Sequence, residues 1–212
     1  MISDLSLFAY GWSETTPHTQ DYLLPSLARI LNLRCPAYGR VLDLGCGNGT
    51  FCHQLSQWGY GVIGVDPSAT GIAIARNLDP NLEFHQVVPT PEALTKLKLS
   101  DFDLVISTEV VEHCFAPRDW AASAYKVLKP VGVFICSSPY HGYFKNLALA
   151  LSGQLDAHFT ALWDGGHIKF WSRDTLTQLL QEAGFVQPQF AGAGRLPWLW
   201  KSMLLSVHKP QV

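Results

Sequence analysis

The stretch RVLDLGCGNGT, residues 40–50, decides the fold of this chain. It opens with a short apolar run that has the composition of a buried strand, and three glycines alternate after it at positions 45, 47 and 49. The residues that follow, 50–58, have helical character. The stretch therefore predicts a strand, a tight turn and a helix. Because glycine lacks a Cβ, such a turn lets a ligand lie directly against the backbone.

The same alternation of strand and helix continues along the chain. Further strands are expected at 60–65, 82–88, 102–107 and 132–136, and helices at 22–33, 69–77, 116–128 and 174–183. The last part, 185–210, has two extended pieces around a centre rich in glycine and proline, as in an antiparallel closing hairpin. This order predicts an α/β fold, a doubly wound, mostly parallel, seven-stranded sheet with helices on both faces.

Size, charge and cysteine usage narrow the class of protein. A length of 212 residues suits a single domain spanning 1–212. Fifteen Lys and Arg against 17 Asp and Glu give a net charge of −2, so we expect no nucleic-acid partner, and a small neutral substrate fits easily. Five cysteines without a CxxC pair argue against a disulfide framework and a zinc site. With no leader or spanning stretch in this sequence, we expect a cytoplasmic protein without stable membrane insertion.

An insertion is predicted at 138–172, between the fifth strand and the late helix. The segment is rich in Tyr, His, Trp and Gly, and the sheet does not need it. Ligands of doubly wound sheets bind beyond the carboxyl ends of the strands, so a segment emerging there forms a cap over the site. Its aromatic side chains could sort a flat substrate or form the core of the cap itself.

A second acidic residue indicates which ligand the glycine turn serves. Asp66 ends the second predicted strand, 66 − 43 = 23 residues after Asp43. A carboxylate at that place can accept hydrogen bonds from both hydroxyl groups of a ribose. A nucleoside ligand is the favoured interpretation, and a tight turn in an α/β protein with another ligand or none is the alternative.

Four motifs together resemble the class I S-adenosylmethionine-dependent methyltransferases: VLDLGCGNG at 41–49, GVDPS at 64–68, FDLVI at 102–106 and LKP at 128–130. The resemblance implies S-adenosylmethionine as cofactor, with S-adenosylhomocysteine as the product. It also implies that the glycine turn faces the methionine part, that Asp66 holds the ribose, and that Thr108 and Glu109 line the pocket. The cofactor-binding residues implied in this way are Asp43, Gly45, Cys46, Gly47, Asp66, Pro67, Thr108 and Glu109.

Within that superfamily, the stretch TEVVEH at 108–113 resembles the O-methyltransferases of ubiquinone biosynthesis. The resemblance implies methyl transfer to a small-molecule acceptor, such as a phenolic or quinone-like hydroxyl. In those enzymes the acidic-acidic-His group is associated with a divalent ion, so Glu109, Glu112 and His113 could hold one. Alternatively, Glu109 touches the cofactor while the other two make local hydrogen bonds. We expect no metal.

Catalysis by such an enzyme can use a base, because an acceptor hydroxyl must lose its proton. Imidazole titrates near neutral pH, which makes His113 and His141 the predicted catalytic residues, with His167 as a further candidate. Each could instead be a structural histidine, and proximity and in-line orientation alone could suffice. A non-catalytic S-adenosylmethionine-binding or scaffold domain, and less readily a dehydrogenase, are the alternative functions. A monomer or a homodimer is expected.

Three further features carry expectations about structure. The turn before the fifth strand reads Pro130-Val131-Gly132, which is tolerated if Val131 has an ordinary negative φ. Tyr10 and Trp12 precede the first helix and could fold over the cofactor as a lid. The apolar residues between 198 and 204 are interpreted as a closing strand, with a dimer patch or a membrane-facing patch as alternatives.

Overall fold

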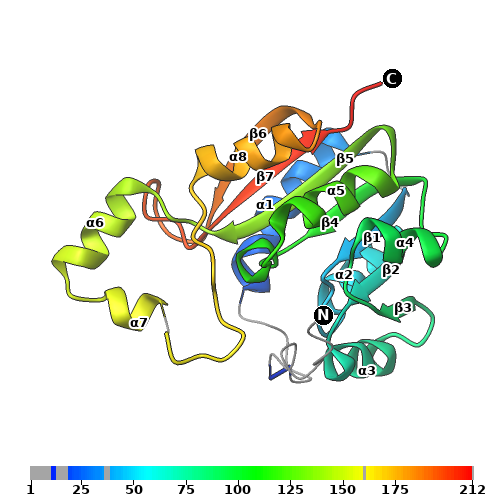
Figure 1. The fold of residues 1–212 in the computed structure, drawn as a ribbon, viewed down its shortest axis with the longest axis horizontal. Coiled ribbons are helices and arrows are strands. Elements are labelled where there is room, and N and C mark those ends of the chain that lie inside the picture. The colour runs from blue at the N-terminus through cyan, green and yellow to red at the C-terminus, as the bar shows by residue number, and fades with distance from the viewer. Residues whose placement is uncertain (1–10, 13–18, 36–38, 160, 212) are drawn as a thin grey trace.

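A computed structural model describes residues 11–12, 19–35, 39–159 and 161–211. Its centre is a seven-stranded sheet in the order β3-β2-β1-β4-β5-β7-β6 (Figure 1). Strands β1 to β5 are parallel, and β7 pairs antiparallel with both β5 and β6. The predicted doubly wound, mostly parallel sheet with an antiparallel closing hairpin is confirmed. The strands are β1 (Arg40–Leu44), β2 (Gly61–Asp66), β3 (Glu83–Gln86), β4 (Phe102–Ser107), β5 (Leu128–Pro139), β6 (Val186–Ala193) and β7 (Ser202–His208).

Helices cover both faces of the sheet and bury two separate apolar clusters. Helices α1 (Gln20–Arg34), α2 (Thr50–Gln57) and α3 (Ala69–Leu78) pack on one face, and α4 (Pro91–Lys96), α5 (Pro117–Val127) and α8 (Arg173–Glu182) pack on the other. Side chains of β4 alternate between the two clusters: Leu104 and Ile106 belong to the first, and Val105 belongs to the second. This period of two is what a strand buried on both faces requires.

Strand β5 departs most from the sequence prediction. It begins at Leu128 and runs for 12 residues, where we expected a helix up to 128 and a strand at 132–136. The strand lies between β4 and β7, so its backbone finds partners along both edges. The condition under which we considered the Pro130-Val131-Gly132 turn tolerated, a negative φ at Val131, is not met, because this residue has a φ of +59°. The Val131 N–H donates to the Lys209 carbonyl, which holds the turn against the end of β7.

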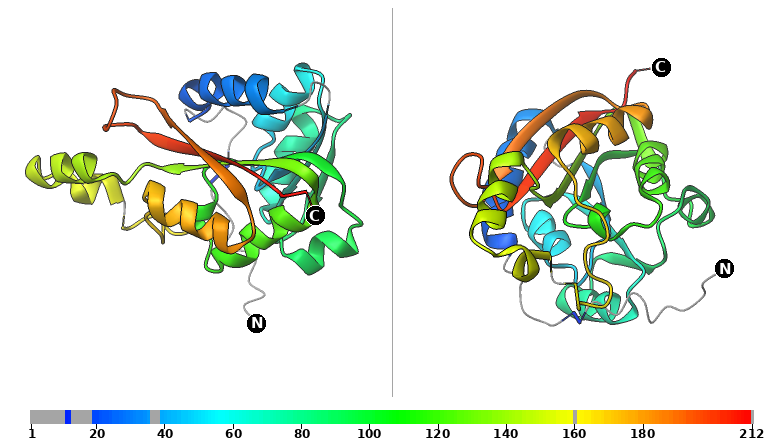
Figure 2. Two further views of the ribbon diagram at one scale, coloured as in Figure 1. Left: turned by 90° about the horizontal axis from the view of Figure 1, so that it is seen from above. Right: turned by 60° about the vertical axis from the view of Figure 1, so that its left-hand side comes forward.

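The segment after β5 contains two helices that the sequence did not predict, α6 (Tyr143–Leu151) and α7 (Leu155–Phe159). Both lie beyond the carboxyl end of β5, to the left of the sheet in Figure 1, and the views in Figure 2 agree. The first residues of the predicted insertion, Ser138 and Pro139, belong to β5 itself. A short α4 and a 3₁₀ turn, η2 (Val111–His113), were also not predicted. Among the described residues, no helix is both long and apolar enough to span a bilayer.

Candidate active site

The glycine turn joins β1 to α2 and is tied to the neighbouring strand. Its first two N–H groups, of Gly45 and Cys46, donate to the Val65 carbonyl at 2.8 and 3.0 Å. Gly45, Gly47 and Gly49 have φ values of +92°, +53° and +78°. This left-handed region suits glycine because it strains any residue with a Cβ. The structure thus explains why three glycines alternate in this turn.

Asp66 connects the end of β2 to the glycine turn. Its Oδ2 accepts a hydrogen bond from the Gly47 N–H at 2.9 Å, and its Oδ1 accepts one from the Ser68 N–H at 2.8 Å. Burial raises the pKa of Asp66 to about 6, although both hydrogen bonds act to lower it. The side chain also lines the large cavity described below. A carboxylate oxygen can accept more than one hydrogen bond, so Asp66 can brace the turn and still bind a hydroxyl group.

Asp43 lies beneath the turn rather than at the cavity surface. It is 1% exposed, and the Cys52 thiol donates to its Oδ2 at 3.2 Å. Burial raises the pKa of Asp43 to about 7 despite that hydrogen bond. In the described part of the chain its Oδ1 makes no hydrogen bond. Asp43 is therefore placed to support the turn from behind.

One cavity of about 1220 Å³ opens beside the turn, at the carboxyl ends of the parallel strands. Its size exceeds the range of about 300–1,000 Å³ that is usual for a single small ligand, so it has room for a cofactor and an acceptor together. Five of the residues implied as cofactor-binding line it: Gly45, Asp66, Pro67, Thr108 and Glu109. Asp43, Cys46 and Gly47 are not in its lining.

The indole of Trp12 covers Gly47, which explains why Gly47 does not line the cavity. A Cβ built on Gly47 would lie 2.4 Å from the six-membered ring of Trp12, and one built on Gly71 would lie 3.0 Å from the same indole. The indole thus lies against the turn and also lines the cavity. Trp12 is in the position expected of a lid residue, whereas Tyr10 lies outside the described residues.

Glu109 follows β4 and faces the cavity with a constrained backbone. Its φ is +55°, a strained value for a residue with a side chain. The Ser137 and Ser202 hydroxyls donate to its two carboxylate oxygens at 2.7 and 3.1 Å. Burial raises the pKa of Glu109 to about 7. The carboxyl group is therefore held in one place between β5 and β7.

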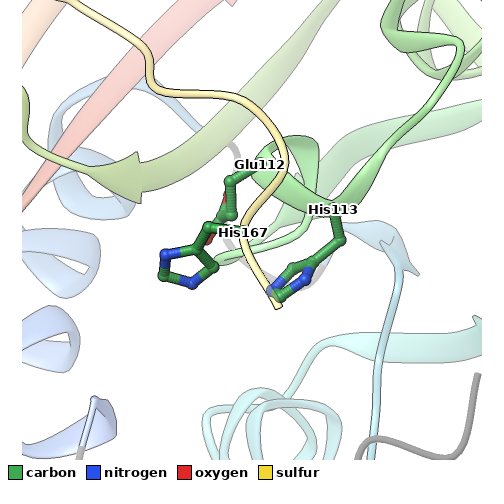
Figure 3. A group of neighbouring side chains, drawn as sticks. All are labelled: Glu112, His113 and His167. Carbon is green, nitrogen blue, oxygen red and sulfur yellow. The ribbon is translucent and has the colours of Figure 1, made fainter. Parts of the chain in front are cut away.

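The one group of side chains in the described residues that could hold a metal ion is Glu112, His113 and His167 (Figure 3). Their possible ligand atoms lie within 4.8 Å of one another. Glu109, which we had placed in the possible metal set, is not part of this group. The N–H groups of Ile168 and Lys169 donate to the Glu112 carbonyl, which brings the loop carrying His167 onto η2.

Burial favours the neutral form of each side chain in this group. Neither carboxylate oxygen of Glu112 makes a hydrogen bond within the described residues, and burial raises its pKa well above the usual range. Burial lowers the pKa of His113 and that of His167, the latter to about 4. His113 Nδ1 lies 2.8 Å from the Gly165 carbonyl, so it carries the proton and Nε2 is the basic nitrogen.

His141, the other predicted catalytic residue, lies in a different environment. Its side chain packs against the rings of His158, Phe159 and Phe170, with centroids 5.1–6.1 Å away. Burial lowers its pKa to about 4, and the side chain does not line the cavity. Of the predicted pair of histidines, His113 alone reaches the cavity.

Sequence reasoning missed three cations that line the cavity. They are Lys145 on α6, Arg195 in the β6–β7 connection, and Lys201 directly before β7. A signal for Lys145 was present, because it is the one charged residue of the helix YFKNLALAL. A lone cation in an apolar helix is expected to face a polar interior or a ligand. No local motif marks the other two.

Comparison with known proteins identifies the family. A family model described as "Methyltransferase domain" matches residues 17–187. The chain belongs to the methyltransferase domain family. S-adenosylmethionine is accordingly the cofactor, and the positive-φ glycines together with Asp66 at the cavity fit it.

Relatives and solved structures similar to this methyltransferase domain agree with that assignment. A ubiquinone biosynthesis O-methyltransferase of Ruegeria sp. (strain TM1040) is 32% identical over 87% of this chain and 77% of its own length. One of Dinoroseobacter shibae is 34% identical over 68% of this chain and 59% of its own length, so the chain spans only part of these relatives. The crystal structure of a SAM-dependent methyltransferase from Archaeoglobus fulgidus shares the fold, with a TM-score of 0.65, 17% identity, and coverage of 97% of this chain and 98% of that one.

Proposed function

We propose that this chain transfers the methyl group of S-adenosylmethionine to a hydroxyl group of a small phenolic or quinol-like acceptor. The observation that carries the proposal is the single cavity, which is lined both by Gly45 and Asp66 and by Lys145 and Trp163 from the segment after β5. A donor and an acceptor bound in one water-poor cavity can react by proximity, which can supply a large part of the rate enhancement. The name of the relatives supports a phenolic or quinol-like acceptor.

The chemistry divides between cofactor and protein. When bound, S-adenosylmethionine supplies an electrophilic methyl group on a sulfonium. Asp66, Thr108 and Glu109 hold the cofactor from the edge of the sheet, and the apolar wall of the cavity excludes water. We assign His113 Nε2 to accept the proton of the acceptor hydroxyl, since the ring is neutral at pH 7 and lines the cavity. His141 is a second and more remote candidate.

A divalent ion is not needed for this scheme. Should one bind, Glu112, His113 and His167 are the residues that would hold it, and it would lower the pKa of a phenolic hydroxyl bound to it. We further propose that residues 1–212 form a single domain, that 138–172 act as its cap, and that the protein is cytoplasmic and a monomer or a homodimer.

The alternative is a non-catalytic domain that binds S-adenosylmethionine without turnover. The test is transfer of labelled methyl groups to catechol, aniline and benzoate, with S-adenosylhomocysteine binding measured on the same preparation. Label appearing in the catechol product, and neither in the aniline nor in the benzoate, is the expected result. Tight binding of S-adenosylhomocysteine with no labelled product from any acceptor class would favour the binding domain instead.

A further inference from the structure

The acceptor end of the cavity holds more positive charge than the described residues compensate. Lys145, Arg195 and Lys201 come from separate segments and line the same wall. None of the three forms an ion pair with a described carboxylate. Of the three, Lys145 is buried, whereas Arg195 and Lys201 are exposed. A buried charge in a protein is ordinarily paired, because desolvation of an unpaired charge is costly. The charge at this wall therefore calls for an anionic partner.

Lys145 provides the strongest evidence for an anionic ligand at this wall. It is 6% exposed although the rest of α6 presents apolar residues to solvent, such as Tyr143 and Leu147. Its Nζ donates one hydrogen bond, 3.3 Å long, to the Lys201 carbonyl, which leaves two N–H groups for a ligand. An apolar helix that directs its one charged side chain inward is unusual for a surface helix.

The surrounding groups do not neutralise Lys145. Burial and, to a smaller extent, the nearby Arg195 charge lower its pKa to about 8, whereas Glu109 acts to raise it. With a pKa of about 8, Lys145 is still mostly protonated at pH 7. The Glu109 carboxyl group is engaged by Ser137 and Ser202 and has a raised pKa of its own, so it compensates at most part of three cationic charges.

We propose that Lys145 and Arg195 bind an anionic oxygen group of the methyl acceptor, so that the acceptor is a hydroxylated aromatic acid rather than a neutral phenol. The inference rests on the proposed methyl transfer. It replaces the small neutral substrate that the net charge suggested, because three cations gather in the cavity lining although the whole chain carries a net charge of −2. The aromatic part of the acceptor has Trp163 and Leu149 to pack against in the same cavity. Carboxylate and phosphate offer the same anionic oxygens, and the experiment separates them.

Calorimetric titration of the protein saturated with S-adenosylhomocysteine tests this without requiring turnover. Two matched pairs of ligands are compared: 3,4-dihydroxybenzoate with catechol, and phenyl phosphate with phenol. We expect one of the two acids to bind at least about tenfold more tightly than its neutral partner. Which acid shows this preference tells whether the site binds a carboxylate or a phosphate. Lys145→Met and Arg195→Gln should each reduce that preference about tenfold. Lys126→Gln, which removes an exposed cation of α5 that does not line the cavity, should leave it unchanged.

Several results would overturn the inference. They are equal binding of acid and neutral partner, no binding of either acid, or a preference that survives in both variants. Loss of S-adenosylhomocysteine affinity in the variants would assign the cations to the cofactor and would also overturn it. Because Arg195 is exposed, Arg195→Gln carries the test even if Lys145→Met folds poorly. A failure of the proposed function would give a different result. No labelled methyl group would be transferred, while the preference for the acid and its dependence on Lys145 would persist.

Discussion

The two ends of the cavity are built in different ways. The proposed cofactor end comes mainly from β1, the glycine turn and the end of β2, which lie within 24 positions of one another, from 43 to 66. Thr108 and Glu109 join it from the end of β4. The acceptor end combines side chains from η2, α6, the loop at 163–167 and the β6–β7 connection. The first end depends on local backbone geometry, and the second depends on how distant segments meet. A local motif can therefore encode the cofactor, while the acceptor is encoded by the whole fold.

The two ends also differ in packing. Around the turn, Gly49 and Gly64 have no room for a Cβ, because Ala75, Phe84 and Cys46 approach them closely. In α6 the one buried side chain is Lys145, and large apolar residues such as Leu151 stay exposed. Changes at the cofactor end should therefore affect folding and cofactor together, whereas changes at the acceptor end should affect the acceptor alone.

The largest effect is expected for Asp66→Ala. The substitution leaves the Gly47 and Ser68 N–H groups without their acceptor, and it removes the carboxylate that we propose binds the ribose. S-adenosylhomocysteine should bind about ten- to a hundredfold more weakly, and the free energy of unfolding should fall by about 1–3 kcal/mol. Calorimetry and urea denaturation measure the two. The exposed Asp164→Ala is the control, and an unchanged affinity in folded Asp66→Ala would remove the ribose assignment.

The second prediction concerns pH and uses Asp43→Asn. The folded-state pKa of Asp43, about 7, lies above its ordinary value of 3.8, so the folded protein binds this proton more tightly than the unfolded chain. Its contribution is fully present below pH 4 and is lost as pH rises towards 7. Asn cannot ionise, so the stability of the variant relative to wild type should improve by about 2–4 kcal/mol between pH 4.5 and pH 7.5. Urea unfolding at the two pH values checks this. If the difference in unfolding free energy between variant and wild type does not change with pH, Asp43 is ionised in the folded protein throughout this range.

The third prediction concerns Gly47→Ala. The φ of +53° and the Trp12 ring, 2.4 Å from where the new Cβ would lie, both oppose the added methyl group. The left-handed backbone alone costs about 1–2 kcal/mol. S-adenosylhomocysteine should bind at least about tenfold more weakly, as seen by calorimetry. Gly61→Ala is the matched control, because nothing lies within 4 Å of its Cβ, and equal behaviour of the two variants would refute the role of the turn.

The sequence predicts the glycine turn and the position of Asp66 well because their signals are local. Alternating glycines after an apolar run, and an acid after the next strand, each depend on a few adjacent residues. The same locality explains the success with the sheet, whose strands show as short apolar runs. It also explains why the conformation of Val131 was not foreseen, since the residue with a φ of +59° donates its N–H to Lys209, which follows the end of β7.

The acceptor end could not be predicted in the same way. His167 meets His113 because the loop carrying it hydrogen-bonds to the Glu112 carbonyl, a contact between residues more than 50 positions apart. The closing hairpin brings Arg195 to the same cavity as Lys145, and no spacing in the sequence indicates that the two residues share it. The choice of His141 over His167 as a base rested on position after a strand, whereas the structure brings His167 to the cavity and packs His141 among rings of the segment after β5.

The smallest effect on the cofactor is expected for two aromatic residues of the segment after β5. Trp163 lines the cavity and contacts His113 with ring centroids 5.7 Å apart, whereas Tyr143 is 75% exposed and does not line it. Trp163→Ala should raise the acceptor KM about three- to tenfold, since an aromatic contact contributes about 0.5–1.5 kcal/mol. Tyr143→Ala should change it less than twofold. Steady-state kinetics and calorimetry on both variants, with melting temperatures checked, give the comparison. In both, the dissociation constant of S-adenosylhomocysteine should stay within about twofold of wild type, because both side chains belong to the segment after β5 and not to the glycine turn or β2. Stable variants that lost cofactor binding but kept acceptor selectivity would reverse the assignment of the two ends.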